Sequence, residues 1–293
     1  QERGIKERQR ADSLAYIDGV RTKLRALSGQ DKLKLVGTAE LAKLYKPATS
    51  SNQVAVYYAE GDIVDQAASG LWSESSPQIV GQKVVADLDK LADDDDVKAV
   101  VLRINSGGGS AYASEQMWRA VQLLKQKKPV VVSMSGMAAS GGYYMACGAD
   151  YIVAEPTTLT GSIGIFGMVP DASGLLTEKL GLHFDVVKTN AASDFGAAGR
   201  PFNVAESAAM QGYVNRGYSL FLKRVAAGRH MKPEQVDQIA QGRVWTGNQA
   251  LKIKLVDKLG TLDDAVAEAA RRAKLSDYAA AAYPAQPSWA ENL

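Results

Sequence analysis

The sequence predicts an α/β fold in which a largely parallel sheet is covered by helices on both faces. From Val54 onward, short runs rich in β-branched residues alternate with stretches of helical periodicity. Strand, helix, strand and helix in this order are typical of a layered α/β domain with a parallel sheet. The expected strands are residues 54–58 (VAVYY), 97–104 (VKAVVLRI), 129–134 (PVVVSM), 151–155 (YIVAE) and 184–189 (FDVVKT).

Helices are expected between these strands and throughout the C-terminal part. Apolar residues recur every three or four positions, which gives one apolar helical face. They are Val80, Val84, Leu88 and Leu91 before the second strand, and Met117, Val121 and Leu124 before the third. Three further helical stretches, residues 204–230, 233–242 and 262–275, follow the last strand. The C-terminal part of the domain is therefore expected to be helical.

Three regions are expected along the chain. Residues 1–52 are interpreted as a helical lead-in and linker, residues 53–275 as the main domain, and the Ala-rich residues 276–293 as a flexible tail. Residues 11–22 (ADSLAYIDGVRT) share an apolar pattern with residues 250–261 (ALKIKLVDKLGT). Two explanations stay open: chance similarity between amphipathic segments, or a tandem duplication whose first copy lies mostly upstream.

The composition excludes several classes of partner. There are 34 Lys and Arg against 32 Asp and Glu, a net charge of +2, so no strong field favours nucleic acid or an anionic membrane. No run of 18 apolar residues occurs, which predicts no membrane span or export leader in these residues. With one cysteine and no calcium-loop spacing in the acidic turn 93–96, we expect neither a metal nor a cofactor. Because the chain starts at Gln1 rather than Met, we expect a piece of a longer protein.

Two glycine-rich turns are candidate sites. Residues 105–110 (NSGGGS) end one strand, and residues 140–142 (SGG) open a helix after another. Glycines leave backbone N–H groups accessible, and a helix start adds unpaired donors, so a serine there faces anionic or carbonyl groups. A structural explanation stays open for each turn. The first can be a phosphate-cradling turn, although it lacks the P-loop spacing, or a plain structural turn, and Ser140 can be a helix N-cap.

The sequence does not identify a base for a hydroxyl nucleophile. A Ser-His-Asp triad would need one of the two histidines, His183 and His230, of which His183 is the better candidate, but neither stands in a catalytic motif. Ser-x-x-Lys is absent, and no Gly-x-Ser-x-Gly surrounds Ser140. A lysine base remains open, and Cys147 is expected to be a buried core thiol.

Taken together, three motifs resemble the signal peptide peptidase A family, serine proteases of the Clp/crotonase fold. They are residues 100–115 (VVLRINSGGGSAYASE), 130–167 (beginning VVVSMSGMAASGGYY and containing LTGSIG) and 239–260 (IAQGRVWTGNQALKIKLVDKLG). The resemblance covers most of residues 54–272. It implies a Clp/crotonase-like layered fold with a mostly parallel sheet and a helical C-terminal part.

The resemblance also implies roles for four residues. Ser140 matches the nucleophile that forms an acyl-enzyme. The backbone N–H groups of Gly109 and Gly141 match the oxyanion hole. Ser162 matches the hydroxyl that orients a lysine base.

The sequence departs from the family pattern at the base and at one glycine. In short members the lysine lies in a KSG-like segment, but the corresponding residues 188–196 (KTNAASDFG) hold Ser193 at that position. Lys188 lies five residues earlier and is not expected to be catalytic. In long, duplicated members the N-terminal half supplies the lysine, so the chain resembles the C-terminal half of such a protein. Gly107 replaces the usual proline of the first turn.

The family further implies a function and a location. The implied function is that of a Ser/Lys endopeptidase that degrades cleaved signal peptides and other apolar peptides. The implied location is the periplasmic face of the inner membrane, where the protein forms a homo-oligomer. Its partner would be the lysine-bearing N-terminal half, without which we expect weak or no activity. Substrates would bind as an added strand, with apolar pockets near residues 163–168.

Two other functions stay open. A crotonase-like acyl-CoA enzyme would use the same pair of N–H donors, but it needs carboxylate groups near them. A catalytically incomplete half that acts as an assembly scaffold would need no base. Labelling of Ser140 by a fluorophosphonate would separate both from a peptidase.

Overall fold

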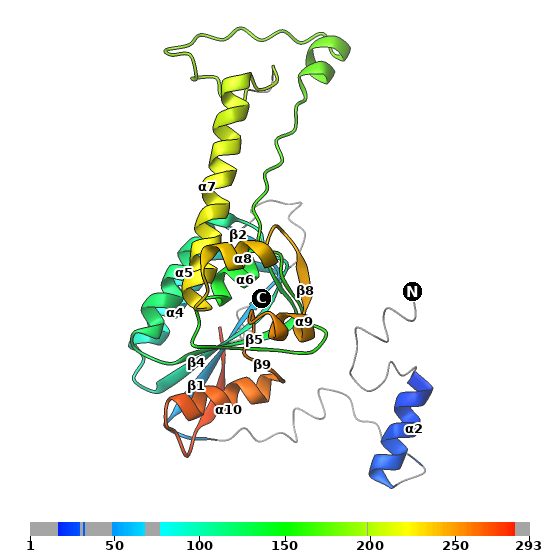
Figure 1. The fold of residues 1–293 in the computed structure, drawn as a ribbon, viewed down its shortest axis with the longest axis vertical. Coiled ribbons are helices and arrows are strands. Elements are labelled where there is room, and N and C mark those ends of the chain that lie inside the picture. The colour runs from blue at the N-terminus through cyan, green and yellow to red at the C-terminus, as the bar shows by residue number, and fades with distance from the viewer. Residues whose placement is uncertain (1–16, 30–31, 33–48, 68–76, 198, 285–293) are drawn as a thin grey trace, which may run out of the picture.

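The computed structural model describes residues 17–29, 32, 49–67, 77–197 and 199–284 (Figure 1). Of the expected lead-in 1–52, it describes the helix α2 (Ile17–Ser28) and few other residues. Part of the repeated segment 11–22 lies outside the described residues, so the duplication stays a prediction.

The sheet is mostly parallel, as the sequence predicts. Its strand order is β10-β1-β4-β5-β6-β9, and every neighbouring pair along this path is parallel. The strands are β1 (Gln53–Glu60), β4 (Val97–Ser106), β5 (Val130–Ala139), β6 (Tyr151–Ala154), β9 (Lys258–Leu259) and β10 (Ala279–Tyr283). Off this path, β7 (Leu159–Gly161) pairs with the end of β5 and, antiparallel, with β8 (Val244–Thr246). A separate ribbon joins β2 (Asp62–Val64) to β3 (Gln78–Val80).

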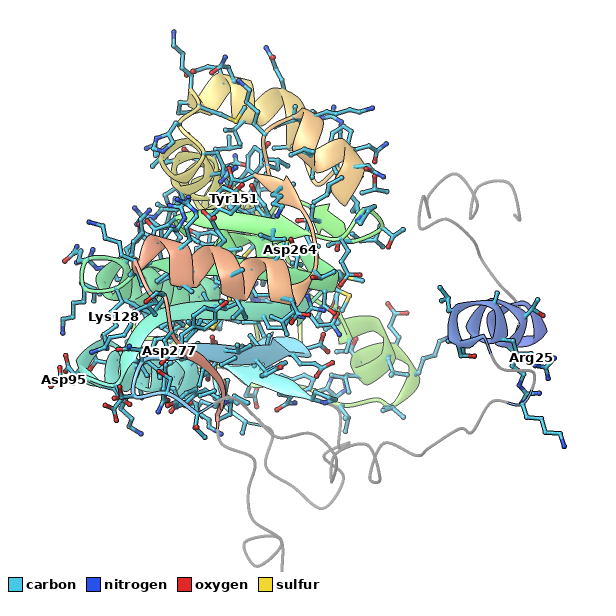
Figure 2. The ribbon with its side chains drawn as sticks, turned by 90° about the horizontal axis from the view of Figure 1, so that it is seen from below. Arg25, Asp95, Lys128, Tyr151, Asp264 and Asp277 are labelled. Carbon is cyan, nitrogen blue, oxygen red and sulfur yellow. The ribbon has the colours of Figure 1, made fainter. Side chains whose placement is uncertain are left out.

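Helices cover both faces of the sheet, which explains why its central strands have apolar side chains on both faces. The helices α4 (Gly81–Asp93), α5 (Ala111–Lys125) and α6 (Gly141–Ala146) contribute to the larger core. The helix α10 (Leu262–Arg272) lies against the other face, as Figure 2 shows from below. Along β4, Val100 and Leu102 enter the first core, whereas Ala99 and Val101 enter the second. The predicted α/β class is confirmed.

The helix α7 (Val204–Gly228) is only partly packed. Its C-terminal half is buried through Phe221 and Val225, and α8 (Pro233–Ile239) and α9 (Gly247–Lys252) follow it. Its N-terminal half projects from the body together with the preceding residues (Figure 1). We call the described residues 166–197 and 199–213 the arm. It includes the short π-helix Leu175–Lys179.

The strand expected at residues 184–189 does not form. These residues lie in the arm without regular structure, and Val187 is 98% exposed. Their β-branched composition favours a strand, but strand propensity acts through cross-strand packing. Within the described residues, no strand lies beside them to provide that packing.

The expected flexible tail is wrong for part of its length. Ala279–Tyr283 form β10, which pairs in parallel with β1 from Gln53 to Tyr57. The pairing is made by backbone groups, and the small side chains of the alanines do not hinder it. Residues 285–293 lie outside the described part. None of the helices described is both long and apolar enough to cross a membrane.

Candidate functional site

A cavity of about 970 Å³ opens where β4 and β5 end. The glycine turn after β4, the start of α6, the turn after β7 and the side of α7 line it. All four sequence-predicted site residues, Gly109, Ser140, Gly141 and Ser162, are among the lining residues. The fold thus brings the two glycine-rich turns and the downstream serine to one place.

Ser140 occupies a constrained turn between β5 and α6. Its backbone has φ 51° and ψ −118°, a conformation that costs free energy for a residue other than glycine. Its N–H donates to the carbonyl of Gly161 (2.9 Å), and its carbonyl accepts from the N–H of Tyr144 (2.8 Å). Ser140 stands at the N-cap position of α6, but its side chain makes no capping hydrogen bond.

The turn after β4 approaches Ser140 so closely that only glycine fits. A Cβ on Gly108 (φ 101°) would lie 2.6 Å from the nitrogen of Gly141 and 2.8 Å from the Cβ of Ser140. On Gly109 (φ 147°) it would lie 2.1 Å from the carbonyl oxygen of Ile63. Both glycines therefore permit contact between two backbones rather than merely a bend.

Strand β2 fixes the position of Gly109. The N–H of Ile63 donates to the carbonyl of Gly108 (2.9 Å), and the carbonyl of Ile63 accepts from the N–H of Ser110 (2.8 Å). In the described part of the chain, the N–H groups of Gly109 and Gly141 donate to no backbone or side-chain acceptor. Two free donors beside a hydroxyl are the arrangement that stabilises an oxyanion. The contact of Ile63 could not be predicted from the sequence, because no local sequence pattern links β2 to this turn.

Ser162 is linked to Ser140 through the backbone. Ser162 (φ 49°) directly follows Gly161, whose carbonyl accepts from the N–H of Ser140. The N–H of Ser162 donates to the carbonyl of Arg243 (2.7 Å) in the turn before β8. The two serines therefore keep a fixed relation along the rim of the cavity.

No lysine, arginine or histidine belongs to the described lining of this cavity. Lys188 lies in the arm, 2.7 Å from a carboxylate oxygen of Asp194. Ser193, which the resemblance predicts at the position of the family's lysine, is exposed, and its hydroxyl accepts from the N–H of Asn190 (3.1 Å). Neither His183 nor His230 is among the lining residues, which leaves a Ser-His-Asp triad without its histidine. Asp62 is the one carboxylate among the described lining residues.

The remaining wall of the cavity is largely apolar. Tyr144 and Phe221 pack with ring centroids 4.4 Å apart, and the Tyr144 hydroxyl donates to Glu115 (2.6 Å). Burial, reinforced by this carboxylate, raises the pKa of Tyr144 well above its usual value. Within the segment 163–168 named for apolar pockets, Ile165 and Phe166 line the cavity.

Cys147 is a core thiol, as expected. Its side chain is fully buried, and its Sγ–H donates to the carbonyl of Tyr144 (3.1 Å). Burial raises the pKa of Cys147 to about 12. The thiol does not line the cavity, so it plays no part in the chemistry there.

Comparisons with known proteins find two matching protein families and several similar proteases. The model of peptidase family S49 matches residues 122–276, and that of Clp protease matches residues 69–158. Protease 4 of Salmonella typhi is 43% identical over 84% of this chain and 38% of its own length. The chloroplastic serine protease SPPA of Arabidopsis thaliana is 34% identical over 92% of this chain and 41% of its own length. A putative protease of Methanocaldococcus jannaschii is 35% identical over 86% of this chain and 76% of its own length.

The chain therefore spans about two fifths of the length of the first two relatives and three quarters of the third. The S49 match begins in α5 and includes the turn of Ser140, the turn of Ser162 and the whole of α7. The Clp match includes the glycine turn beside Ser140 and implies the Clp/crotonase-like fold. The S49 model matches more than half of the chain, and this match shows that the chain belongs to peptidase family S49.

Proposed function

We propose that this chain is the nucleophile-bearing part of a serine peptidase whose lysine base comes from another part of the assembly. One observation carries the proposal. The hydroxyl of Ser140 makes no capping bond and lies in a constrained turn beside the unpaired N–H groups of Gly109 and Gly141. The described residues that line the cavity include no lysine, arginine or histidine that could act as the base.

The proposed reaction is acyl transfer. The Oγ of Ser140 attacks the peptide carbonyl carbon, and its proton passes to the neutral amine of the lysine. The N–H groups of Gly109 and Gly141 donate to the oxyanion that forms. The C–N bond then breaks, and the leaving amine takes the proton from the lysine. Water hydrolyses the ester by the same proton path, and Ser162 orients the lysine throughout.

The lysine must be desolvated to act as a base. Its pKa has to fall from about 10.4 to about 7 or 8, a change of roughly 4 kcal/mol against the charged form. Burial between two protein surfaces supplies a shift of this size. The same contact that delivers the amine would therefore also tune it. By this argument the isolated chain has weak or no activity.

The arm supplies a surface for such a partner. Many of its large apolar side chains are exposed, and exposed apolar surface is typical of protein contacts. The large apolar residues of the arm that are at least 58% exposed are Phe166, Met168, Leu175, Leu180, Val187, Val204 and Tyr213. We propose that a second copy of this fold, whether the lysine-bearing half or another protomer, covers them in a homo-oligomer.

The substrate class is also part of the proposal. The apolar wall formed by Tyr144, Phe221 and Ile165 suits aliphatic side chains of an extended peptide. Cleaved signal peptides are such peptides. The resemblance to signal peptide peptidases supports this substrate and a location on the periplasmic face of the inner membrane, with any membrane anchor outside this chain.

The test is labelling and peptide hydrolysis by the chain alone and by the chain combined with the preceding half. We expect fluorophosphonate labelling and turnover only in the combination, and Ser140→Ala abolishes both. Ser193→Ala is the matched control and leaves both unchanged. Robust turnover by the isolated chain would overturn the external base.

Two outcomes would replace the proposal altogether. Self-association without labelling, even in the combination, would identify a scaffold. Binding of coenzyme A without labelling would identify the crotonase-like enzyme, with Asp62 as its only candidate acid among the described lining residues.

A further inference from the structure

Strand β5 bulges immediately before Ser140. In the ladder with β4, Ile104 pairs with Met134 and Ser106 pairs with Ala138, so β5 advances by four residues where β4 advances by two. Bulges bend a strand and redirect the side chains that follow, and they are frequent next to active sites. The direction in which Ser140 leaves the sheet therefore depends on how firmly this bulge is held.

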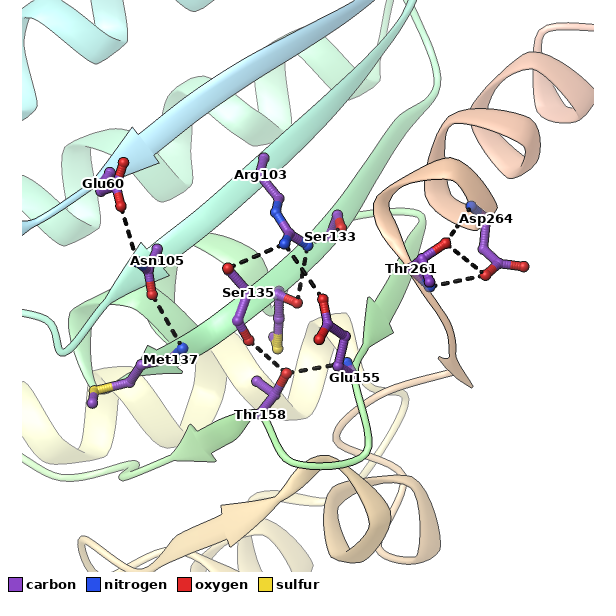
Figure 3. A network of polar contacts seen from close by, with 11 residues as sticks. Glu60, Arg103, Asn105, Ser133, Ser135, Met137, Glu155, Thr158, Thr261 and Asp264 are labelled. Carbon is purple, nitrogen blue, oxygen red and sulfur yellow. Dashed lines mark hydrogen bonds and ion pairs between the residues drawn. The ribbon is translucent and has the colours of Figure 1, made fainter. Parts of the chain in front are cut away.

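Side chains from outside the bulge bond its backbone polar groups (Figure 3). The guanidinium of Arg103 donates to the carbonyl of Met134 (3.3 Å). The hydroxyl of Thr158 donates to the carbonyl of Ser135 (2.6 Å). The N–H of Met137 donates to the side-chain oxygen of Asn105 (3.3 Å). These three side chains replace the ladder bonds that the bulge interrupts.

Each of the three side chains is fixed by a second bond. The Thr158 hydroxyl accepts from the N–H of Glu155 (3.1 Å), and the Thr158 residue is 1% exposed. The Asn105 amide donates to Glu60 on β1 (3.0 Å). Arg103 also donates to the hydroxyl of Ser135 (3.1 Å). The bulge is thus tied to strands β1 and β4 and to the loop that precedes β7.

We propose that Thr158, Asn105 and Arg103 are positioning residues that hold the β5 bulge and thereby direct Ser140 toward the N–H groups of Gly109 and Gly141. The inference rests on the proposed function. None of the three residues lines the cavity, so they act only through the backbone. A residue with positive φ, such as Ser140, keeps that conformation only when its surroundings determine it. The bulge ends two residues before it, at Ala138.

Thr158 gives the sharpest test because its bonds can be removed without changing its shape. Thr158→Val removes the donor to the part-buried Ser135 carbonyl, whereas Thr158→Ser keeps the hydroxyl. We expect Thr158→Val to slow fluorophosphonate labelling of the complete, lysine-containing protein about tenfold or more, and Thr158→Ser to restore most of the rate. Equal rates for Thr158→Val and the parent protein would overturn the inference and leave the proposed function intact.

A control separates positioning from general destabilisation. Thr261 caps α10, where its hydroxyl accepts from the N–H of Asp264, on the far side of the sheet from the cavity. Thr261 makes none of the three bonds that hold the β5 bulge, so Thr261→Ala loses stability of the order expected for a lost helix cap and leaves those bonds in place. We expect normal labelling from this variant. If it slowed labelling as much as Thr158→Val, the effect would be general stability and the inference would be wrong.

Asn105 offers an independent rescue. Asn105→Asp keeps an acceptor for the N–H of Met137 but places a second carboxylate against Glu60. We expect slower labelling, and recovery in the double variant Asn105→Asp with Glu60→Gln, whose amide can donate to the new carboxylate. Failure of the double variant to recover any rate would contradict the role of Asn105.

Hydrogen–deuterium exchange provides a readout that does not depend on activity. Thr158→Val should raise the exchange rate of the peptide spanning residues 135–141, and leave peptides of α4 unchanged. Unchanged exchange in residues 135–141 would overturn the inference even if labelling slowed. If the parent protein is not labelled at all, the proposed function fails, and the inference about Ser140 fails with it.

Discussion

At the scale of single residues, the site depends on where side chains are absent. Gly108 and Gly107 are neighbours in the sequence, yet their surroundings differ. A Cβ on Gly108 would meet the backbone of Gly141, whereas a Cβ on Gly107 would meet only the flexible Met137 side chain at 3.3 Å. The first position therefore tolerates no side chain, and the second does.

Gly108→Ala should therefore lower the reactivity of Ser140 by about a hundredfold, while Gly107→Ala should leave it nearly unchanged. The added methyl of Gly108→Ala forces the glycine turn away from Ser140, and a shift of about 1 Å costs on the order of a hundredfold in rate. Fluorophosphonate labelling of the complete protein measures this. Full labelling of Gly108→Ala would show that the turn does not need its close approach.

Cys147 should be inert toward thiol reagents in the native protein. With its pKa raised to about 12 by burial, almost no thiolate exists at pH 8, and reagents cannot reach the sulfur. We expect no reaction with iodoacetamide until the protein is unfolded in urea. Rapid native alkylation would contradict the burial and would reopen a thiol mechanism.

At the scale of elements, the start of α7 depends on charge. Asn203 and Glu206 form a capping box, and Arg200 makes a bidentate ion pair with Glu206 at 2.7 Å. The Arg200 guanidinium, with the N–H of Asn203, lowers the pKa of Glu206 to about 2. The ordinary value is 4.5, so the charged carboxylate is favoured in the folded arm.

Lowering the pH should therefore loosen the start of α7. Because the folded pKa lies below the ordinary one, the stabilisation is complete above pH 4.5 and is lost as pH falls toward 2. The amide signals of Glu206 and Ser207 in nuclear magnetic resonance spectra would follow this loss. Glu206→Gln serves as the control and removes this carboxylate's contribution. Signals that do not change between pH 5 and 2 would contradict the ion pair.

Strand β10 makes a second element-scale prediction. Its five residue pairs with β1 are a backbone ladder, and each hydrogen bond contributes about 0.5–1.5 kcal/mol net. Deleting residues 279–293 should lower the free energy of unfolding by about 2–4 kcal/mol in urea titrations. Deleting only residues 285–293 is the control and should have little effect. Equal stability of the two truncated proteins would show that residues 279–283 belong to the flexible tail that their composition indicates.

At the scale of the whole molecule, the arm is the largest departure from a self-contained domain. Val187→Asp should reduce self-association in sedimentation velocity without lowering the stability of the monomer, because Val187 is 98% exposed in the single chain. A charge would be costly only where a partner covers it. Leu27→Asp, at an exposed position on α2 outside the arm, is the matched control. Unchanged association would exclude this part of the arm from the interface.

The sequence by itself determined the layered fold and marked four residues that line the cavity, Gly109, Ser140, Gly141 and Ser162. Apolar runs such as residues 99–102 required burial on both faces, and the motifs around Ser140 and Ser162 marked turns that the fold brings together. These signals are local, because hydrophobic periodicity and turn-forming residues can be recognised from neighbouring positions in the sequence.

Only the tertiary structure decided which segments find partners. Residues 184–189 have the composition of a strand and remain unpaired, whereas the Ala-rich residues 279–283 pair with β1. The contact of Ile63 with the glycine turn and the side chains that hold the β5 bulge also join distant segments. Strand pairing and backbone contacts of this kind depend on which groups meet in space, and no local pattern in the sequence records that.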